Sequence, residues 1–144
     1  MIFTPLALAT AAAFAGAAIY INWSEQPARL GLDDVSLLKA WKPSYAKGFE
    51  MQATLALASG LSGLAAWYFE SRPAAAIGGV LMLANWPYTL IAIAPTNRAL
   101  GNTADRDAGP DSRALILRWG RLHAVRSLLG VAGASAFLIA SVTG

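Results

Sequence analysis

An all-α, integral membrane four-helix bundle with a Pro-kinked third helix is the fold class that this sequence predicts. Hydrophobic residues make up 56% of the chain and charged residues only 13%, against roughly 25% charged in an ordinary soluble domain. Four apolar runs approach or exceed the roughly 20 residues that a membrane-spanning helix needs. A chain of 144 residues has room for one core, so residues 1–144 are expected to form a single transmembrane domain.

The first two apolar runs cover residues 3–21 and 51–69. No Lys or Arg precedes the first run, and it continues past the "AFA" at 13–15 that resembles a cleavage site. It is therefore expected to be a retained helix and not a removed signal peptide. The second run is expected to extend back toward Tyr45. A soluble bundle is the alternative, but the first and third runs lack the polar outer face that it requires.

The third run covers 73–94 and the fourth extends from about Asp111 to Val142. Pro73 opens the third run, and Pro95 is expected to end it. Pro87 lies inside it; because proline lacks an N–H and displaces the carbonyl four residues earlier, a kink is expected there. Asp111 is a suitable N-cap for the fourth helix.

Basic residues predict how the bundle lies in the membrane. They gather between the first and second runs and between the third and fourth, whereas the turn between the second and third has only Arg72. The positive-inside rule then places both long loops in the cytoplasm and both termini outside, with a bacterial inner membrane as the expected location. The net charge of +3 is accordingly assigned to the membrane surface and not to nucleic acid.

Small residues recur at four-residue spacing in the apolar runs, as in Ala56 with Gly60 and Ala75 with Gly79. Such spacing lets helix backbones approach closely where lipid provides no hydrophobic drive between them. We expect close packing within the bundle, and the same faces are compatible with a homo-oligomer.

Trp119, His123 and Arg126 are the most informative polar residues. They occupy positions i, i+4 and i+7 at the start of the fourth run and so project from one helical face. Arg126 is flanked by apolar residues, and a charge at such a depth usually faces the bundle interior and pairs with another group. Glu25 and Glu50 are the candidate partners. A purely structural role for His123 is an equally weighted alternative.

Other polar residues have simpler structural explanations. Asn97, after Pro95, can bond to the local backbone in a turn. Glu25 can lie near a helix start or form an interfacial pair with Arg29. Trp86 lies beside Pro87, and the expected kink there can serve helix packing alone.

Few kinds of chemistry remain open to this chain. It has no cysteine and one histidine, and it contains no Glu-x-x-His motif, phosphate loop or dinucleotide fingerprint. We therefore expect no metal site and no cofactor.

Three motifs together resemble a known family. They are "EQPARL" at 25–30, "PTNRAL" at 95–100 and "RWGRLHAVRSLL" at 118–129. With these motifs the chain resembles, over essentially its whole length, the four-helix integral membrane family that includes the fungal anthrone oxygenases. The resemblance implies oxidation of an anthrone to an anthraquinone with molecular oxygen and without flavin or haem.

A mechanism can be placed on the motif positions as a hypothesis. Loss of the acidic C–H of an anthrone gives an enolate that reacts with oxygen. His123 would be the base, because the ordinary pKa of histidine lies near neutrality. Arg126 and Asn97 would stabilise the oxyanion, and Glu25 would orient the imidazole or neutralise Arg126.

The same hypothesis assigns ligand contacts to further residues. Flat aromatic side chains stack on a flat polycyclic ligand, and the residues expected to bind the substrate are Trp119, Trp86, Tyr88 and Arg29. The expected partners are a small lipophilic aromatic molecule and the lipid bilayer.

Two other functions stay open. In the first, the chain is a non-catalytic membrane binding or assembly protein whose polar cluster only clamps the helices. That alternative predicts a filled core with Arg126 and Glu25 in a closed ion pair, whereas an enzyme predicts an open cavity beside His123. The second, a small transporter, is disfavoured because the polar residues cluster at one end of only four spans.

Overall fold

The computed structural model describes residues 1–143, which form a bundle of four helical rods and contain no strand. In chain order the elements are α1 (Phe3–Tyr20), the π-helical turn η1 (Ile21–Glu25), α2 (Gln26–Leu30), α3 (Asp34–Glu70), α4 (Pro73–Tyr88), the π-helical turn η2 (Thr89–Ile93), α5 (Ala94–Asn102), the 3-10 turn η3 (Asp105–Asp107) and α6 (Pro110–Val142). Elements α1, η1 and α2 follow one another without a break, as do α4, η2 and α5. The predicted all-α bundle is confirmed.

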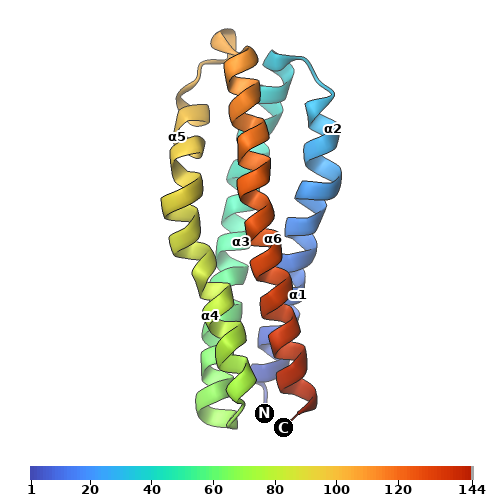
Figure 1. Ribbon diagram of the computed structural model, residues 1–144, viewed down its shortest axis with the longest axis vertical. Helices are drawn as coiled ribbons and strands as arrows, with labels where there is room; N and C mark the ends of the chain where they lie inside the picture. The colour runs from blue at the N-terminus through green and yellow to red at the C-terminus, as the bar shows by residue number, and fades with distance from the viewer. Residues whose placement is uncertain (144) are drawn as a thin grey trace.

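The rods form a square in cross-section. Helix α1 packs against α3 and α6, and α4 packs against the same two helices, so α1 and α4 occupy opposite corners. Both chain termini lie at one end of the bundle, together with the turn from α3 to α4 (Figure 1). The connections that follow α2 and α5 lie at the other end.

Three rods are long and apolar enough to cross a membrane, namely Phe3–Leu30, Pro73–Asn102 and Pro110–Val142. The chain is a membrane protein on this evidence. We expected four such rods, and α3 is not among them, although it is 37 residues long. Its apolar half contains Gln52, Ser59, Gly60 and Gly63, which are buried against neighbouring helices. These residues lower the hydropathy of α3 while fitting it to the interior of the bundle.

Two expected boundaries were wrong. The residues between the first and second apolar runs were expected to form a long loop, but they are helical except for a short turn at 31–33. The third rod was expected to end at Pro95, but it continues to Asn102. The fourth rod begins near Asp111 and ends at Val142, as predicted, but its N-cap is Gly109 and not Asp111.

The π-helical turns explain how two rods continue past Pro27 and Pro95. Each turn ends two residues before a proline, Pro27 after η1 and Pro95 after η2. The N–H of Gln26 bonds to the carbonyl of Ile21, and that of Ala94 to Thr89, five residues back in both cases. A wide turn of this kind leaves room for the proline ring, which would otherwise clash with the carbonyl four residues earlier.

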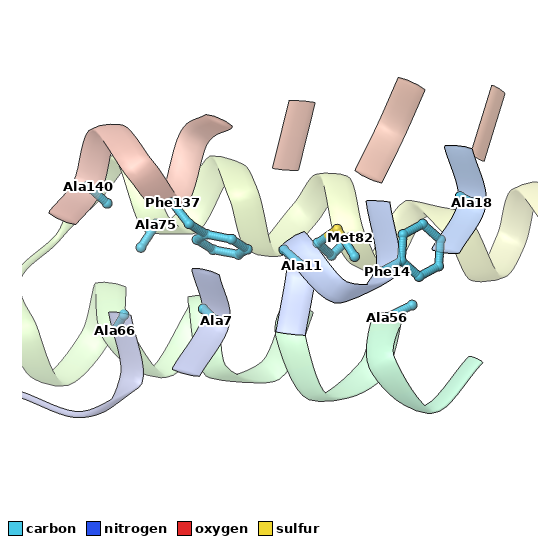
Figure 2. Close-up of a cluster of buried hydrophobic side chains, with 10 residues drawn as sticks. All are labelled: Ala7, Ala11, Phe14, Ala18, Ala56, Ala66, Ala75, Met82, Phe137 and Ala140. Carbon is cyan, nitrogen blue, oxygen red and sulfur yellow. The ribbon is translucent and has the colours of Figure 1, made fainter. Parts of the chain in front are cut away.

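Two hydrophobic clusters fill the bundle at different heights. The first, near the termini, is built from alanines around Phe14, Met82 and Phe137 (Figure 2). The second, near the opposite end, contains Trp41 and Trp119 together with aliphatic side chains. Along every rod the residues between these clusters include buried polar side chains, so a polar layer separates two apolar ones.

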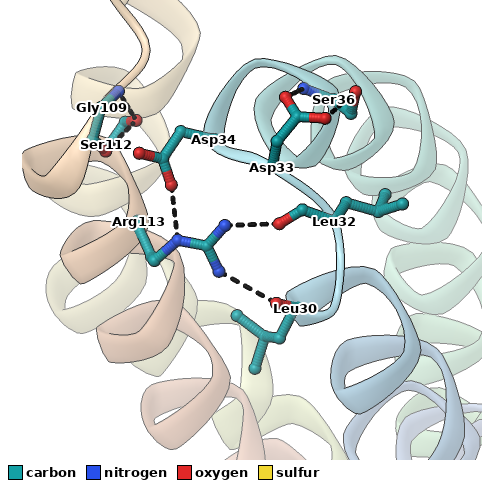
Figure 3. Close-up of polar contacts among 8 residues, drawn as sticks. All are labelled: Leu30, Leu32, Asp33, Asp34, Ser36, Gly109, Ser112 and Arg113. Atoms are coloured by element: carbon teal, nitrogen blue, oxygen red, sulfur yellow. Dashed lines mark hydrogen bonds and ion pairs between the residues drawn. The ribbon is translucent and has the colours of Figure 1, made fainter.

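Arg113 of α6 holds the turn at 31–33 in place. Its guanidinium donates to the backbone carbonyls of Leu30 and Leu32 and pairs with the carboxylate of Asp34 (Figure 3). Because these groups lie at the end of α2 and the start of α3, one side chain ties three rods together at the end of the bundle opposite the termini.

Helices α3 and α4 approach closely at Gly60 and Gly79. A Cβ added to Gly79 would lie 3.0 Å from the carbonyl oxygen of Gly60 and 3.2 Å from the backbone N of Leu64. Both neighbours are backbone atoms, which cannot move aside as a flexible side chain can. The predicted small-residue contact between these helices is therefore present.

We expect Gly79→Ala to destabilise the bundle by about 1–3 kcal/mol, because the added methyl group overpacks a backbone contact. Gly16→Ala is the matched control, since a Cβ at Gly16 meets nothing within 4 Å and alanine favours a helix interior. Thermal unfolding in detergent measures both. Equal melting temperatures for the two variants would contradict the close contact.

We also expect a pH-dependent contribution from Glu70, which follows the second apolar run and lies outside it. Its carboxylate accepts from the hydroxyl of Thr4 at 2.6 Å and from the N–H groups of Phe3 and Thr4 at the start of α1. The hydrogen bond from the Thr4 hydroxyl, followed by those from the two N–H groups, lowers the pKa of Glu70. A lowered pKa means that this stabilisation is present above the unfolded-state pKa and is lost as the pH falls through the folded-state value.

Glu70→Gln should therefore lower the melting temperature at neutral pH and have progressively less effect in acid. Melting curves of both proteins between pH 7 and about pH 3 give the comparison. A difference in melting temperature that stays constant over this range would rule out the ionised cap.

Candidate functional site

A cleft lies within the polar layer and is lined by residues of all four rods. The space between its side chains is about 380 Å³, counting the part that opens outside. Most of that space consists of crevices no wider than a water molecule, so a flat polycycle enters only when side chains at the rim turn aside. Six of the eight predicted site residues line the cleft: Glu25, Arg29, Asn97, Trp119, His123 and Arg126.

His123 is held by Asn22, a residue of η1 to which the sequence assigned no role. The side-chain N–H of Asn22 donates to the carbonyl of Gly120 at 2.8 Å, which leaves its Oδ1 as the acceptor. His123 Nδ1 lies 2.7 Å from that Oδ1, and the hydroxyl of Ser127 donates to the same oxygen at 2.9 Å. Because Asn22 Oδ1 can only accept, Nδ1 carries the proton of the neutral ring. Nε2 is then the ring nitrogen with a free lone pair.

Arg126 is buried without a carboxylate partner. Its side chain is 6% exposed, its Nε has no hydrogen-bond partner, and none of the ion pairs among residues 1–143 includes it. The guanidinium lies 5.4 Å from the centre of the Phe14 ring, a weak cation–π contact. Burial of an unpaired cation is costly, so the site favours a ligand that brings negative charge.

Glu25 does not pair with Arg126, as one sequence hypothesis had it. Its carboxylate lies 3.0 Å from Arg29 Nη1, which also donates to the hydroxyl of Ser44 at 2.6 Å. Arg29 Nε donates to Gln26 Oε1, and that amide in turn donates to the carbonyl of Ile116. The alternative pairing of Glu25 with Arg29 is the one observed, and the imidazole is oriented by Asn22 in its place.

The second expected partner, Glu50, does not form an ion pair with Arg126 either. It lies 3.6 Å from Lys47 on the exposed face of α3. The cleft therefore contains two guanidinium groups and one carboxylate, and it is positively charged when all three are ionised.

Trp119 lines the cleft, and its main contact is with the imidazole of His123. Its ring stacks on the imidazole with centroids 4.9 Å apart, and the guanidinium of Arg29 lies 5.2 Å from its centre. Trp41 meets it edge-on at 5.8 Å. These contacts occupy much of the indole surface and restrict the rotation of His123.

Several buried amide groups in the cleft have no partner. Asn97 Oδ1 is unpaired, and both polar atoms of Gln52 are unpaired although Gln52 is only 1% exposed. The sequence did offer a signal for Gln52, because an amide within an otherwise apolar run needs a reason.

Trp86 and Tyr88 lie outside this cleft. Trp86 lines a neighbouring pocket and meets Phe49 edge-on at 6.5 Å. Tyr88 lines neither cavity; its hydroxyl donates to the carbonyl of Leu122 at 2.8 Å and so ties α4 to α6.

The polar layer lies near one face of the membrane by length alone. A hydrocarbon core roughly 30 Å thick takes about 20 helical residues. Counted from the end that carries the termini, 20 residues reach the level of Asn22 on the first rod and His123 on the last.

Within residues 1–143, no three His, Cys, Asp or Glu side chains gather as a metal site would require.

Comparisons with known proteins agree on one family. The sequence model of a family described as anthrone oxygenase matches residues 41–136. An anthrone oxygenase of Claviceps purpurea is 31% identical over 114 residues, which are 71% of this chain and 66% of that protein. One from Pestalotiopsis fici is 28% identical over 125 residues, 72% of this chain and 83% of its own length.

A third relative matches over a shorter region. An anthrone oxygenase of Aspergillus fumigatus is 41% identical over 61 residues, 40% of this chain and 37% of that protein. The chain thus spans slightly less than two thirds of the Claviceps relative and a smaller part of the Aspergillus one. No solved structure matches it.

The Asn22 contact predicts the tautomer of the histidine. His123 is the only histidine in the chain, so ¹⁵N-histidine labelling yields a single imidazole in the NMR spectrum. At neutral pH we expect a protonated Nδ1 and an unprotonated Nε2 in the wild-type protein. Asn22→Ala should produce a mixture of tautomers, because the acceptor that selects Nδ1–H is gone.

Asn102→Ala, at an exposed position on α5, is the control and should leave the spectrum unchanged. A protonated Nε2 in the neutral wild-type ring would contradict the assignment.

Proposed function

The chain belongs to the anthrone oxygenase family, and we propose that it oxidises a flat, lipophilic, phenolic or anthrone-type compound with molecular oxygen, with His123 as the base. The observation that carries this proposal is the contact between His123 and Asn22. It leaves the basic nitrogen of a buried imidazole free, in a cleft that also contains the unpaired Arg126.

The reaction begins with proton transfer from the substrate to His123. Nε2 takes a proton from the methylene carbon of the anthrone, whose electron pair becomes part of an extended enolate. The negative charge then lies largely on the oxygen across the ring system. Base catalysis of this kind contributes roughly 10²- to 10⁴-fold in rate.

Oxygen then reacts with the enolate. One electron passes from the enolate to O₂, the two radicals combine to form a C–O bond, and the resulting peroxide anion takes a proton from the imidazolium. Loss of the remaining hydrogen on that carbon together with cleavage of the O–O bond releases water and leaves a carbonyl group. One anthrone and one O₂ thereby give one anthraquinone and one water.

Arg126 and Asn97 are proposed to stabilise the oxyanion. The guanidinium is a donor with no competing carboxylate, and the amide of Asn97 lines the same cleft. Fixed donors in a water-poor site stabilise developing charge without having to reorganise. Arg29, already paired with Glu25, is proposed to form one wall of the substrate site, as the sequence hypothesis had it.

A non-catalytic binding or assembly protein is the competing function. It predicts an ion pair between Arg126 and Glu25 inside a filled core. The pairing of Glu25 with Arg29 leaves Arg126 without a carboxylate partner, and this favours the oxygenase instead.

We expect His123→Gln to lower anthrone-dependent oxygen uptake by about 10²- to 10⁴-fold, because the base is lost. Arg126→Met should lower it by about 10²- to 10³-fold, because the oxyanion loses its strongest donor. An oxygen electrode measures the uptake with purified protein in detergent or nanodiscs.

Arg118→Met is the matched control, since Arg118 is an exposed arginine on the same helix and touches neither cavity. Full activity in the His123 variant would disprove the assignment of the base.

A further inference from the structure

A second cavity lies beside the cleft, between α3 and the rod of α4 and η2. Its side chains leave about 260 Å³ of space, counting the open part, and most of that space is narrower than a water molecule, so an aromatic ring enters only when side chains at the rim turn aside. We call it the α3–α4 pocket. Phe49, Thr89 and Arg126 line both this pocket and the cleft, so the two cavities are neighbours with the same guanidinium between them.

Three polar side chains in this pocket are buried and incompletely satisfied. Asn85 is 1% exposed, and Thr89 and Arg126 are each 6% exposed. Asn85 Oδ1, Thr89 Oγ1 and Arg126 Nε have no hydrogen-bond partner. Each such group costs free energy in an apolar environment unless something binds to it. These atoms therefore indicate a polar group that enters the pocket.

The unpaired atoms define the chemistry of that group. The side-chain N–H of Asn85 donates to helix carbonyls, with Met82 O at 3.1 Å, so only its Oδ1 is left to bind and it needs a donor. Arg126 can only donate, whereas the hydroxyl of Thr89 can do either. A carboxylate would set a negative oxygen against Asn85 Oδ1, and a bare carbonyl has no proton to give. A hydroxyl group can donate to Asn85 and, through its two lone pairs, accept from both Arg126 and Thr89.

An exposed apolar residue lines the pocket. Leu90 on η2 lines it and is 59% exposed, on a rod that is long and apolar enough to span a membrane. Phe49 and Trp86 also line it and meet edge-on. An aromatic body that follows the hydroxyl group inward therefore meets aromatic walls, which favour flat ligands.

We propose that the α3–α4 pocket is a second subsite, in which Asn85 accepts a hydrogen bond from a hydroxyl group of a flat aromatic ligand that arrives from the bilayer. Thr89 and Arg126 donate to the oxygen of that hydroxyl. The inference rests on the proposed function only in that the ligand is flat and aromatic, and it requires no turnover.

The test compares two unreactive probes that differ by one hydroxyl group. They are 2-hydroxyanthraquinone, whose hydroxyl has no internal hydrogen bond, and anthraquinone. Quenching of tryptophan fluorescence in nanodiscs measures their binding, with empty nanodiscs as the blank. We expect the hydroxylated probe to bind the wild-type protein about tenfold more tightly, the effect of one or two net hydrogen bonds.

Two near-isosteric variants remove the hydrogen-bonding groups. Asn85→Leu and Thr89→Val should weaken binding of 2-hydroxyanthraquinone by about 5- to 10-fold and leave anthraquinone within about twofold. Thr89→Ser restores a hydroxyl and should recover the preference. Thr54→Val makes the same change as Thr89→Val at an exposed position of α3 outside both pockets, and it should behave as wild type.

Three results would overturn the inference. They are equal binding of the two probes by the wild-type protein, failure of both probes to bind, and an equal loss of both probes in the Thr89→Val variant. The outcome is separable from that of the proposed function. His123→Gln removes the base but leaves the α3–α4 pocket intact, so that variant should lose oxygen uptake and still prefer the hydroxylated probe.

Discussion

The unpaired positive charge of Arg126 is the constraint around which this bundle is organised. A guanidinium held between two apolar clusters without a carboxylate is costly, and no ion pair among residues 1–143 offsets that cost. The surroundings provide only the face of Phe14 and a set of amide and hydroxyl groups. Such a charge makes sense where a ligand supplies negative charge, which is the requirement that enolate chemistry imposes.

The two rods that contain π-helical turns give the polar layer its shape. Each contains a π-helical turn just before a proline, and each turn carries a residue of the layer, Asn22 in η1 and Thr89 in η2. A wider turn changes the direction in which the following side chains point, and π-helical turns are common at functional sites for that reason. The π-helical turns that accommodate Pro27 and Pro95 lie at the level of the cleft, and residues of both turns line it.

Aromatic and polar residues have divided roles in the cleft. Trp119 and Asn22 hold the imidazole of His123 from two sides, by stacking and by a hydrogen bond, so the ring has one orientation and one neutral tautomer. Glu25 and Arg29 form a separate ion pair in the lining of the cleft. The shared position of Arg126 then connects the cleft to the α3–α4 pocket.

Composition and periodicity by themselves determined the helical class, the approximate positions of the rods, and the shared face of Trp119, His123 and Arg126, because these properties depend on local hydropathy and on the 3.6-residue repeat. Only the tertiary structure decided which groups meet. Asn22 Oδ1 forms a hydrogen bond with His123, which lies 101 residues away in the sequence. Glu25 forms an ion pair with Arg29 and not with Arg126. Partners of this kind depend on the relative rotation of packed rods. No periodicity within one segment contains that information.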